Sequence, residues 1–460
     1  MDKYKRLFSN TLIFAIGTFS SKLLSFFLTR LYTEVLDQGQ YGITDMLQHS
    51  GNLLLPLITL GITNAVVRFG LDKGVRKSDV FTTGLVSLLG GMVLLLLLSP
   101  LLGFIPLVTD YVWLLCVFVF TSSLRSLCAQ FVRAQNRIKL FAVDGILSTL
   151  TTIIFNILFL VVCKFGIVGY MFSIICSDVL SVIFLVVAAR LHQFVNIRSL
   201  DFKVMRSMLK YAIPLIPNTV LWWITNVSDR YIVSWVHGEA YTGLYAAAYK
   251  IPSLVILVSG IFMDAWQISA VTEEEGRSRF YTKVSSLYSS LLFVMTSGVI
   301  LLTRFVPHIL FAKEYYTAWR YIPLLAVTVI FTCLVNFLGS IYMVEKKSVH
   351  SLLTALLSAV INIVFNLLWI PKYGVNGAAA ATLLCYVVVF VVRVIDTRQY
   401  VRIHWRYPRL LICTALVLAQ VAIMLCEVPL WMLWETLLFG AMVALCGKDL
   451  LACVKHLLKR

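Results

Sequence analysis

The chain has 460 residues, of which 60% are hydrophobic and only 13% are charged, and its formal net charge is +17. A soluble protein carries about 25% charged residues and could not bury this much apolar surface. The composition therefore excludes a soluble protein and predicts that the excess apolar surface faces lipid.

Apolar stretches that could cross a bilayer follow one another along the whole chain. A helical span needs about 20 apolar residues. The spans we expect are residues 8–32, 41–69, 80–102, 109–132, 140–163, 166–189, 211–236, 241–268, 282–303, 320–343, 349–370, 374–394, 407–426 and 429–446. The sequence thus predicts an all-α integral membrane protein of about 14 transmembrane helices, without a sizeable soluble domain.

Lys and Arg are distributed unevenly between the two sets of connecting segments. The loops and tails on the side of both termini hold roughly 28 of them, and the opposite loops hold roughly 5. Because basic residues accumulate on the cytoplasmic side, we expect both termini to be cytoplasmic. This bias accounts for most of the positive charge, so nucleic-acid binding is a poor explanation of it.

The ten cysteines are scattered singly along the chain, nearly all of them within apolar spans. Neither they nor the seven histidines form a cluster at metal-ligand spacing. We therefore expect no disulfide framework, no metal site and no cofactor.

Two parts of the chain repeat each other. Residues 156–159 (NILF) and 164–169 (KFGIVG) are echoed by residues 362–365 (NIVF) and 372–377 (KYGVNG). Six helices per copy is an even number, so both copies point the same way across the membrane. The predicted organisation is an N-terminal lobe (1–193), a cytoplasmic linker (194–210), a C-terminal lobe (211–395) and two further helices (396–460).

Several short motifs resemble those of a known family. They are NTL (10–12), SSK (20–22), LYT (31–33), YG (41–42), PLIPN (214–218), SDRY (228–231) and YKIP (249–252). Together with the layout of six, six and two helices, they resemble the oligosaccharide flippases of the multidrug/oligosaccharidyl-lipid/polysaccharide exporter superfamily. The resemblance covers about residues 5 to 395 and does not specify a sugar. It implies alternating-access export of a polyprenyl-pyrophosphate-linked oligosaccharide across a bacterial inner membrane for cell-surface polysaccharide biosynthesis.

Polar residues recur at helical spacing in the first two spans. They are Thr11, Thr18, Lys22, Ser25 and Thr29 in the first span, and Asp45, His49, Asn52, Thr59 and Thr63 in the second. Ionisable groups inside a membrane usually face a cavity or a partner, so these stripes predict a wet cavity wall. Hydrogen bonding between packed helices is the alternative.

A set of cations is expected to hold the pyrophosphate of a substrate. Lys22 and His49 lie on the polar stripes, and Lys250 corresponds to His49 when Gly42 is matched with Gly243 in the repeat. Arg30 and Arg230 correspond to each other at the outer ends of their spans, where the alternative role is extension of the side chain to the interface. We predict that these five residues bind substrate; the polar residues Asp45, Asn52 and Ser25 are expected to line the same cavity.

Arg125 and Asp144 lie at similar depth on either side of a cytoplasmic hairpin, which predicts a structural ion pair. Asp178 and Asp264 receive no role from the sequence. Each could carry a coupling proton, pair with a cation or lie near water.

The expected partners are the lipid-linked glycan, membrane lipids, and the glycosyltransferases and polymerase of the same pathway. Two alternatives within transport and assembly remain open. A drug exporter of the same superfamily should have an acidic cavity, and a membrane glycosyltransferase, polymerase or ligase should have a long external loop. A scaffold for an envelope assembly is the third alternative, against which the charged interior argues. We do not expect an enzyme.

Overall fold

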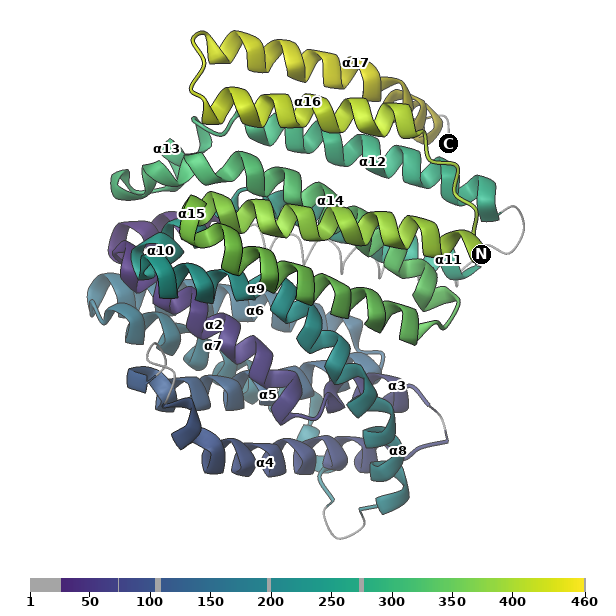
Figure 1. Cartoon of the computed structure of the whole chain (residues 1–460). Helices are drawn as coiled ribbons and strands as arrows, with labels where there is room; N and C mark the ends of the chain where they lie inside the picture. The colour runs from purple at the N-terminus through teal and green to yellow at the C-terminus, as the bar shows by residue number, and fades with distance from the viewer. Residues whose placement is uncertain (1–25, 73, 104–108, 197–199, 273–276, 459–460) are drawn as a thin grey trace. The chain divides into compact units, whose positions relative to one another are not determined.

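The computed structural model describes residues 26–72, 74–103, 109–196, 200–272 and 277–458. Throughout these ranges the regular secondary structure is helical, without a strand (Figure 1). Eight helices in this part of the chain are long and apolar enough to cross a membrane, and two bent helix pairs raise that number to ten. The all-α membrane fold is therefore confirmed, whereas the count of about 14 spans and the cytoplasmic termini stay predictions.

The chain divides into two compact units, with unit 1 ending at Trp223 and unit 2 beginning at Ile224. The first predicted span (8–32) lies mostly outside the described residues, and residues 26–35 are helical. The other helices of unit 1 are α2 (Gln38–Ile58), α3 (Ile62–Gly70), α4 (Lys77–Leu102), α5 (Val112–Ala134), α6 (Ile138–Asn156), the π-helical η2 (Ile157–Val162), α7 (Gly166–Ala189), α8 (Phe202–Ala212) and the start of α9 (Ile216–His237).

Unit 2 begins within α9 and contains the remaining long helices. These are α10 (Glu239–Lys250), α11 (Ser253–Thr272), α12 (Arg277–Leu301), α13 (Val306–Leu310), the 3-10 helix η6 (Lys313–Tyr321), α14 (Ile322–Val344), α15 (Ser348–Asp396), α16 (Tyr407–Leu425) and α17 (Trp431–Leu458). Gly374, at φ 59° and ψ −138°, interrupts α15 where two separate spans were expected.

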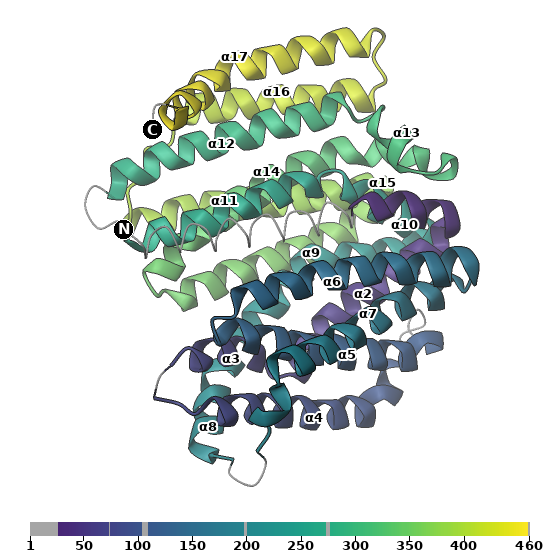
Figure 2. The ribbon, with the colours of Figure 1, turned by 180° about the vertical axis from the view of Figure 1, so that it is seen from behind.

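The core of unit 1 includes the helix that follows the predicted linker. Helix α8 has an apolar face, and its Met208 and Ala212 belong to the same buried cluster as Val66, Leu88 and Phe131. Figures 1 and 2 show, in two opposite views, α4 running beside α5, with α8 at one end of α4. Because α8 packs on unit 1, the boundary between the compact units falls inside α9, after the predicted linker at 194–210.

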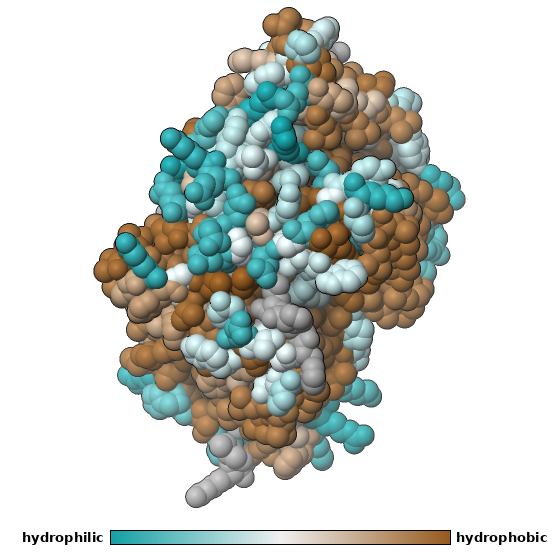
Figure 3. All heavy atoms as spheres, turned by 60° about the vertical axis from the view of Figure 1, so that its left-hand side comes forward, coloured by the Kyte–Doolittle hydropathy of each residue, from teal (hydrophilic) through white to brown (hydrophobic). Residues whose placement is uncertain are grey.

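Exposed apolar side chains cover the outer faces of several helices. Helix α4 is an example, since Val93, Leu94, Leu96 and Leu97 are each at least half exposed. Apolar side chains, brown in Figure 3, cover broad areas of the visible face. Such faces would be costly in water, and they suit contact with the acyl chains of lipids.

The internal repeat has a structural counterpart within each unit. The turns that follow α5 and α14 place Asn136 and Lys346, which are 210 residues apart, at positive φ. Asn156 and Asn366, with the same separation, are both fully buried, and each donates its Nδ2 hydrogen to an oxygen four residues earlier. The structure therefore favours Asn366, rather than Asn362, as the counterpart of Asn156.

After Asn156 the separation between counterparts in the two units changes, and the π-helical segment Ile157–Val162 lies where it does so. Gly166 and Gly374 both have positive φ, but they are only 208 residues apart. A π-helix holds more residues per turn than an α-helix, and the two additional residues of unit 1 fall within η2 and the turn at Lys164 that follows it.

Candidate functional site

Helix α2 carries the described part of the predicted cavity wall. The Asp37 side chain caps the helix, accepting a hydrogen bond from the Gln40 amide. Asp45 is buried, and its Oδ1 lies 3.6 Å from Nε2 of His49 on the next turn. The His49 carbonyl accepts a hydrogen bond of 2.8 Å from Trp223 Nε1, and the Asn52 side chain is exposed. Two polar side chains one turn apart thus share a face of α2.

The other predicted cations lie in different settings. Lys22 and Ser25 lie outside the described residues. Lys250 is half-buried at the last position of α10, immediately before that span bends by 46° towards α11. His49 belongs to unit 1 and Lys250 to unit 2, so the convergence of Lys22, His49 and Lys250 stays a prediction.

Arg30 already has an acidic partner. Its guanidinium lies 2.6 Å from Glu34 Oε1, four residues later on the same helical segment, and both side chains are about half exposed. Opposite charges four residues apart on a helix are the sequence signal for this pair. The match of Arg30 with Arg230 in the repeat does not take Glu34 into account.

Arg230 lies in a buried aromatic setting within unit 2. Its side chain is 4% exposed, and Nη1 donates a 2.8 Å hydrogen bond to the Asn226 carbonyl. The guanidinium carbon lies 5.3 Å and 5.2 Å from the ring centroids of Tyr245 and Tyr249, within the range of cation–π attraction. Such burial argues against extension of this side chain to the membrane interface.

Asp229 completes this cluster. Its Oδ2 accepts a 2.5 Å hydrogen bond from Tyr245, and its Oδ1 lies 3.5 Å from Arg230. The cation therefore has both a carboxylate and aromatic faces around it.

Hydrogen bonds to two asparagine side chains join α9 to α15 in the same unit. Tyr386 donates to Asn226 Oδ1 at 2.6 Å, and Ser228 donates to Asn362 Oδ1 at 2.9 Å. Asn362 in turn donates to Thr382 at 3.0 Å. Asparagines inside apolar spans are the signal that could have identified these hydrogen bonds from the sequence.

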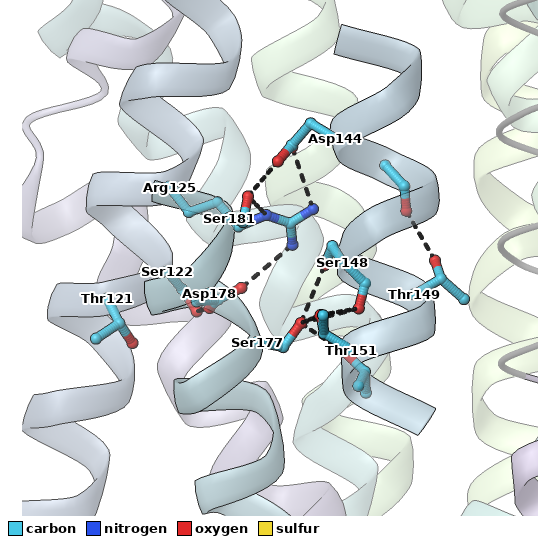
Figure 4. Close-up of polar contacts among 12 residues, drawn as sticks. Thr121, Ser122, Arg125, Asp144, Ser148, Thr149, Thr151, Ser177, Asp178 and Ser181 are labelled. Carbon is cyan, nitrogen blue, oxygen red and sulfur yellow. Dashed lines mark hydrogen bonds and ion pairs between the residues drawn. The ribbon is translucent and has the colours of Figure 1, made fainter. Parts of the chain in front are cut away.

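A buried ionic network joins three helices of unit 1 (Figure 4). Arg125 on α5 lies 3.6 Å from Asp144 on α6, the partner expected from the sequence, and 3.2 Å from Asp178 on α7. Its Nε donates to Ser181 at 3.0 Å. Ser122 and Ser181 also donate short hydrogen bonds to Asp178 and Asp144, respectively. One guanidinium therefore compensates two buried carboxylates, with hydroxyls satisfying the remaining oxygens.

Asp178 and Asp264, which receive no role from the sequence, differ in their surroundings. Asp178, as shown, pairs with a cation, while Asp264 on α11 is exposed. Within the described ranges, no group of three or more His, Cys, Asp or Glu side chains is arranged to hold a metal ion.

The chain is similar to known proteins over part of its sequence. The profile of the family described as "Polysaccharide biosynthesis protein" matches residues 7–267. A protein of Haloferax volcanii named "Probable low-salt glycan biosynthesis flippase Agl15" is 22% identical over 233 residues, 48% of each chain. The chain thus spans about half the length of this curated relative.

Solved structures match a larger part of the chain. A structure titled "Lipid II flippase MurJ, inward closed conformation" has a TM-score of 0.72 at 15% identity, covering 96% of this chain and 99% of its own. The MATE transporter VcmN of Vibrio cholerae has a TM-score of 0.61 at 13% identity, covering 86% of this chain and 96% of its own. These likenesses establish a shared all-helical transporter fold.

Proposed function

Because the chain belongs to the polysaccharide biosynthesis protein family, we propose that it is a flippase for polyprenyl-pyrophosphate-linked oligosaccharides. It would move these lipids from the inner to the outer leaflet of the cell membrane for cell-surface polysaccharide biosynthesis. The observation that carries the proposal is the family match over residues 7–267, which includes both the polar face of α2 and the Arg230 cluster. The relative named as a glycan biosynthesis flippase and the fold shared with a lipid II flippase support it.

The transport mechanism we propose is alternating access through a cationic cavity. A pyrophosphate loses hydration on entering a membrane, and charged hydrogen bonds from Lys22 and Lys250, with a further hydrogen bond from His49, would offset that cost. Arg30 and Arg230 are proposed to contact the substrate near the outer end, where Glu34 and Asp229 moderate their charge. Asp45, Asn52 and Ser25 would add hydrogen bonds along the same wall. No bond is made or broken in this process.

Bends in two spans suit such a mechanism. The pair α2 and α3 is bent by 57°, and the pair α10 and α11 by 46°. Proline and residues of positive φ produce these breaks, at Leu60 and Gly61 in the first pair and at Pro252 in the second. Because hinge motions use a few residues at helix ends, these breaks are the proposed hinges.

A drug exporter is the second candidate, favoured by the fold shared with MATE transporters. The predicted cavity is basic, which disfavours organic cations as substrates. We also propose a multi-pass location in a bacterial cell membrane, and glycosyltransferases and a polymerase as pathway partners. A membrane-bound assembly enzyme remains the alternative from another class.

Reconstitution tests the proposal. The purified protein in liposomes should move a fluorescent polyprenyl-pyrophosphate oligosaccharide between leaflets, measured by the fraction that an impermeant quencher reaches. Protein-free liposomes and a cationic dye are the controls. Transport of the dye without movement of the lipid-linked glycan would favour the drug exporter.

A further inference from the structure

A cavity of about 520 Å³ lies within unit 1, and none of the five cations assigned to the substrate above lines it. It forms where α3, the end of α5 and the segment from α8 to α9 meet. Its lining residues are Thr63, Asn64, Val67, Arg68, Gln130, Arg133, Tyr211, Leu215, Asn218 and Thr219. This volume lies within the usual range of ligand pockets, about 300–1,000 Å³.

The break between α2 and α3 lies beside this cavity, since Thr63 and Asn64 follow it directly. Gly61 has φ 63°, and a Cβ there would lie 3.2 Å from the Ala212 carbonyl at the end of α8. The chain can therefore turn closely past α8 and direct α3 away from the line of α2. Leu215 and Asn218, which also line the cavity, belong to the PLIPN motif.

The charge of the lining is positive. Arg68 and Arg133 are both exposed at the cavity, and the ten described lining residues include no Asp or Glu. The Arg68 guanidinium lies over the Tyr211 ring at 4.6 Å, which holds its plane in place. Two guanidinium groups, each able to donate paired hydrogen bonds, suit a phosphate or pyrophosphate.

The lining also contains acceptors that lack donors. The amide oxygens of Gln130 and Asn218 are buried, and no described atom donates a hydrogen bond to either. Buried acceptors without a partner are costly, so a ligand with hydroxyl or amide hydrogens would stabilise them. An ionised pyrophosphate esterified at both ends has no such donors, whereas the sugar attached to it has.

The predicted topology places this cavity at the cytoplasmic end of unit 1. Helix α5 ends there at Ala134, one residue after Arg133 and just before the basic residues Arg137 and Lys139. These residues belong to a loop expected inside the cell. The cavity would therefore face the leaflet in which a lipid-linked glycan is assembled.

We propose that this cavity is a loading site that binds the pyrophosphate and first sugar of the substrate before transport. The proposal rests on the proposed function. Arg68 and Arg133 bind the pyrophosphate, and the amides of Gln130 and Asn218 accept hydrogen bonds from the sugar.

A thiol-protection assay at Thr219→Cys, an exposed position of the lining, tests this directly. The variant is made in a background without native cysteines, purified in neutral detergent and labelled with a maleimide. Farnesyl-pyrophosphoryl-N-acetylglucosamine should slow labelling at this position. Ser207→Cys, exposed on α8 but outside the lining, is the matched control and should label at the same rate with or without the probe.

The charge requirement is tested by adding Arg68→Ala and Arg133→Ala together. The probe concentration that gives half protection should rise at least tenfold. Arg206→Ala, which removes an exposed cation of α8 outside the lining, should leave it within twofold. Equal protection in the double arginine variant and the parent would overturn the proposal.

Two further probes identify the ligand chemistry. Gln130→Leu with Asn218→Leu should weaken protection by the sugar probe but not by inorganic pyrophosphate. If the leucine substitutions change protection by the two probes to the same extent, the proposed contact between these amides and the sugar is wrong. If phosphatidylglycerol in nanodiscs protects Thr219→Cys and the sugar probe does not, the cavity binds phospholipid and the proposal fails.

The liposome assay separates this site from the function. If the wild type moves the lipid-linked glycan while the double arginine variant retains full protection, only the loading site is wrong. If protection behaves as proposed but the wild type moves no glycan, the proposed function is wrong and the binding site stands.

Discussion

Arg125 illustrates how much can depend on one side chain in an apolar setting. Its guanidinium is the only described cation within ion-pair distance of Asp144 and Asp178, whose carboxyls are almost fully buried. The pair with Asp144 could be expected from depth along two consecutive spans. The contact with Asp178 could not, because the periodicity of a single helix does not specify which neighbouring helix it faces.

We expect Arg125→Ala to destabilise the protein by about 3–5 kcal/mol, because it leaves two buried carboxylates without a counter-charge. Thermal unfolding in detergent, followed by tryptophan fluorescence, measures this loss. Arg30→Ala is the matched control, since its exposed pair with Glu34 contributes at most about 1 kcal/mol. Equal melting temperatures for Arg125→Ala and the wild type would contradict the importance of the network.

Lys22→Ala and Lys250→Ala should each abolish glycan export without changing protein abundance, because each removes a charge that offsets pyrophosphate dehydration. Replacement of either lysine by arginine keeps the charge and should retain part of the activity. The flip rate in liposomes and an immunoblot of membranes provide the two readouts. If both alanine variants, singly and together, transport at the wild-type rate, the cationic cavity is wrong.

At the scale of helices, the apolar pattern of the sequence predicts where the membrane spans lie, but it does not predict where they bend. The spans expected at 166–189 and 320–343 agree closely with α7 and α14. The spans expected at 41–69 and 241–268 are each broken in two, because apolar residues continue through the bend. The sequence predicts only a linker where α8 lies. The apolar face of α8 indicates packing only when the helices next to it are known.

Close helix contacts explain why particular small residues occur where they do. A Cβ at Gly91 on α4 would lie 1.8 Å from the Ile58 carbonyl, whereas one at Gly90 would meet nothing within 4 Å. Gly91→Ala should therefore cost about 1–3 kcal/mol through overpacking. Gly90→Ala should be neutral or stabilising by up to about 1 kcal/mol, because alanine favours helix. Melting temperatures of the two neighbouring variants test the contact, and equal values would refute it.

At the scale of the whole molecule, composition was sufficient for the fold class, because no soluble packing can bury so much apolar surface. The burial of individual side chains and the residues that they contact could be obtained only from the structure. Arg30 and Arg230 are matched in the repeat, yet one is half exposed beside Glu34 and the other is buried among tyrosines. Sequence position alone does not contain that difference.

The orientation is tested with single cysteines at Lys203, Lys347, Glu239 and Lys372, all of which have exposed side chains. The excess of basic residues on one side predicts that Lys203 and Lys347 are cytoplasmic and that Glu239 and Lys372 are external. An impermeant thiol reagent should therefore label only the last two positions in intact cells. Labelling at Lys203→Cys before permeabilisation would invert the topology.

The π-helical segment Ile157–Val162 bears on the ancestry of the chain. Two copies of one gene joined end to end would begin with helices of equal length. From Asn136 and Lys346 to Asn156 and Asn366 the counterparts keep the same separation, and between there and the glycines Gly166 and Gly374 it shortens. The difference thus dates from after the duplication, as a gain in one copy or a loss from the other. A chimera that carries the same form of the segment in both halves would re-create the symmetric arrangement that followed the duplication.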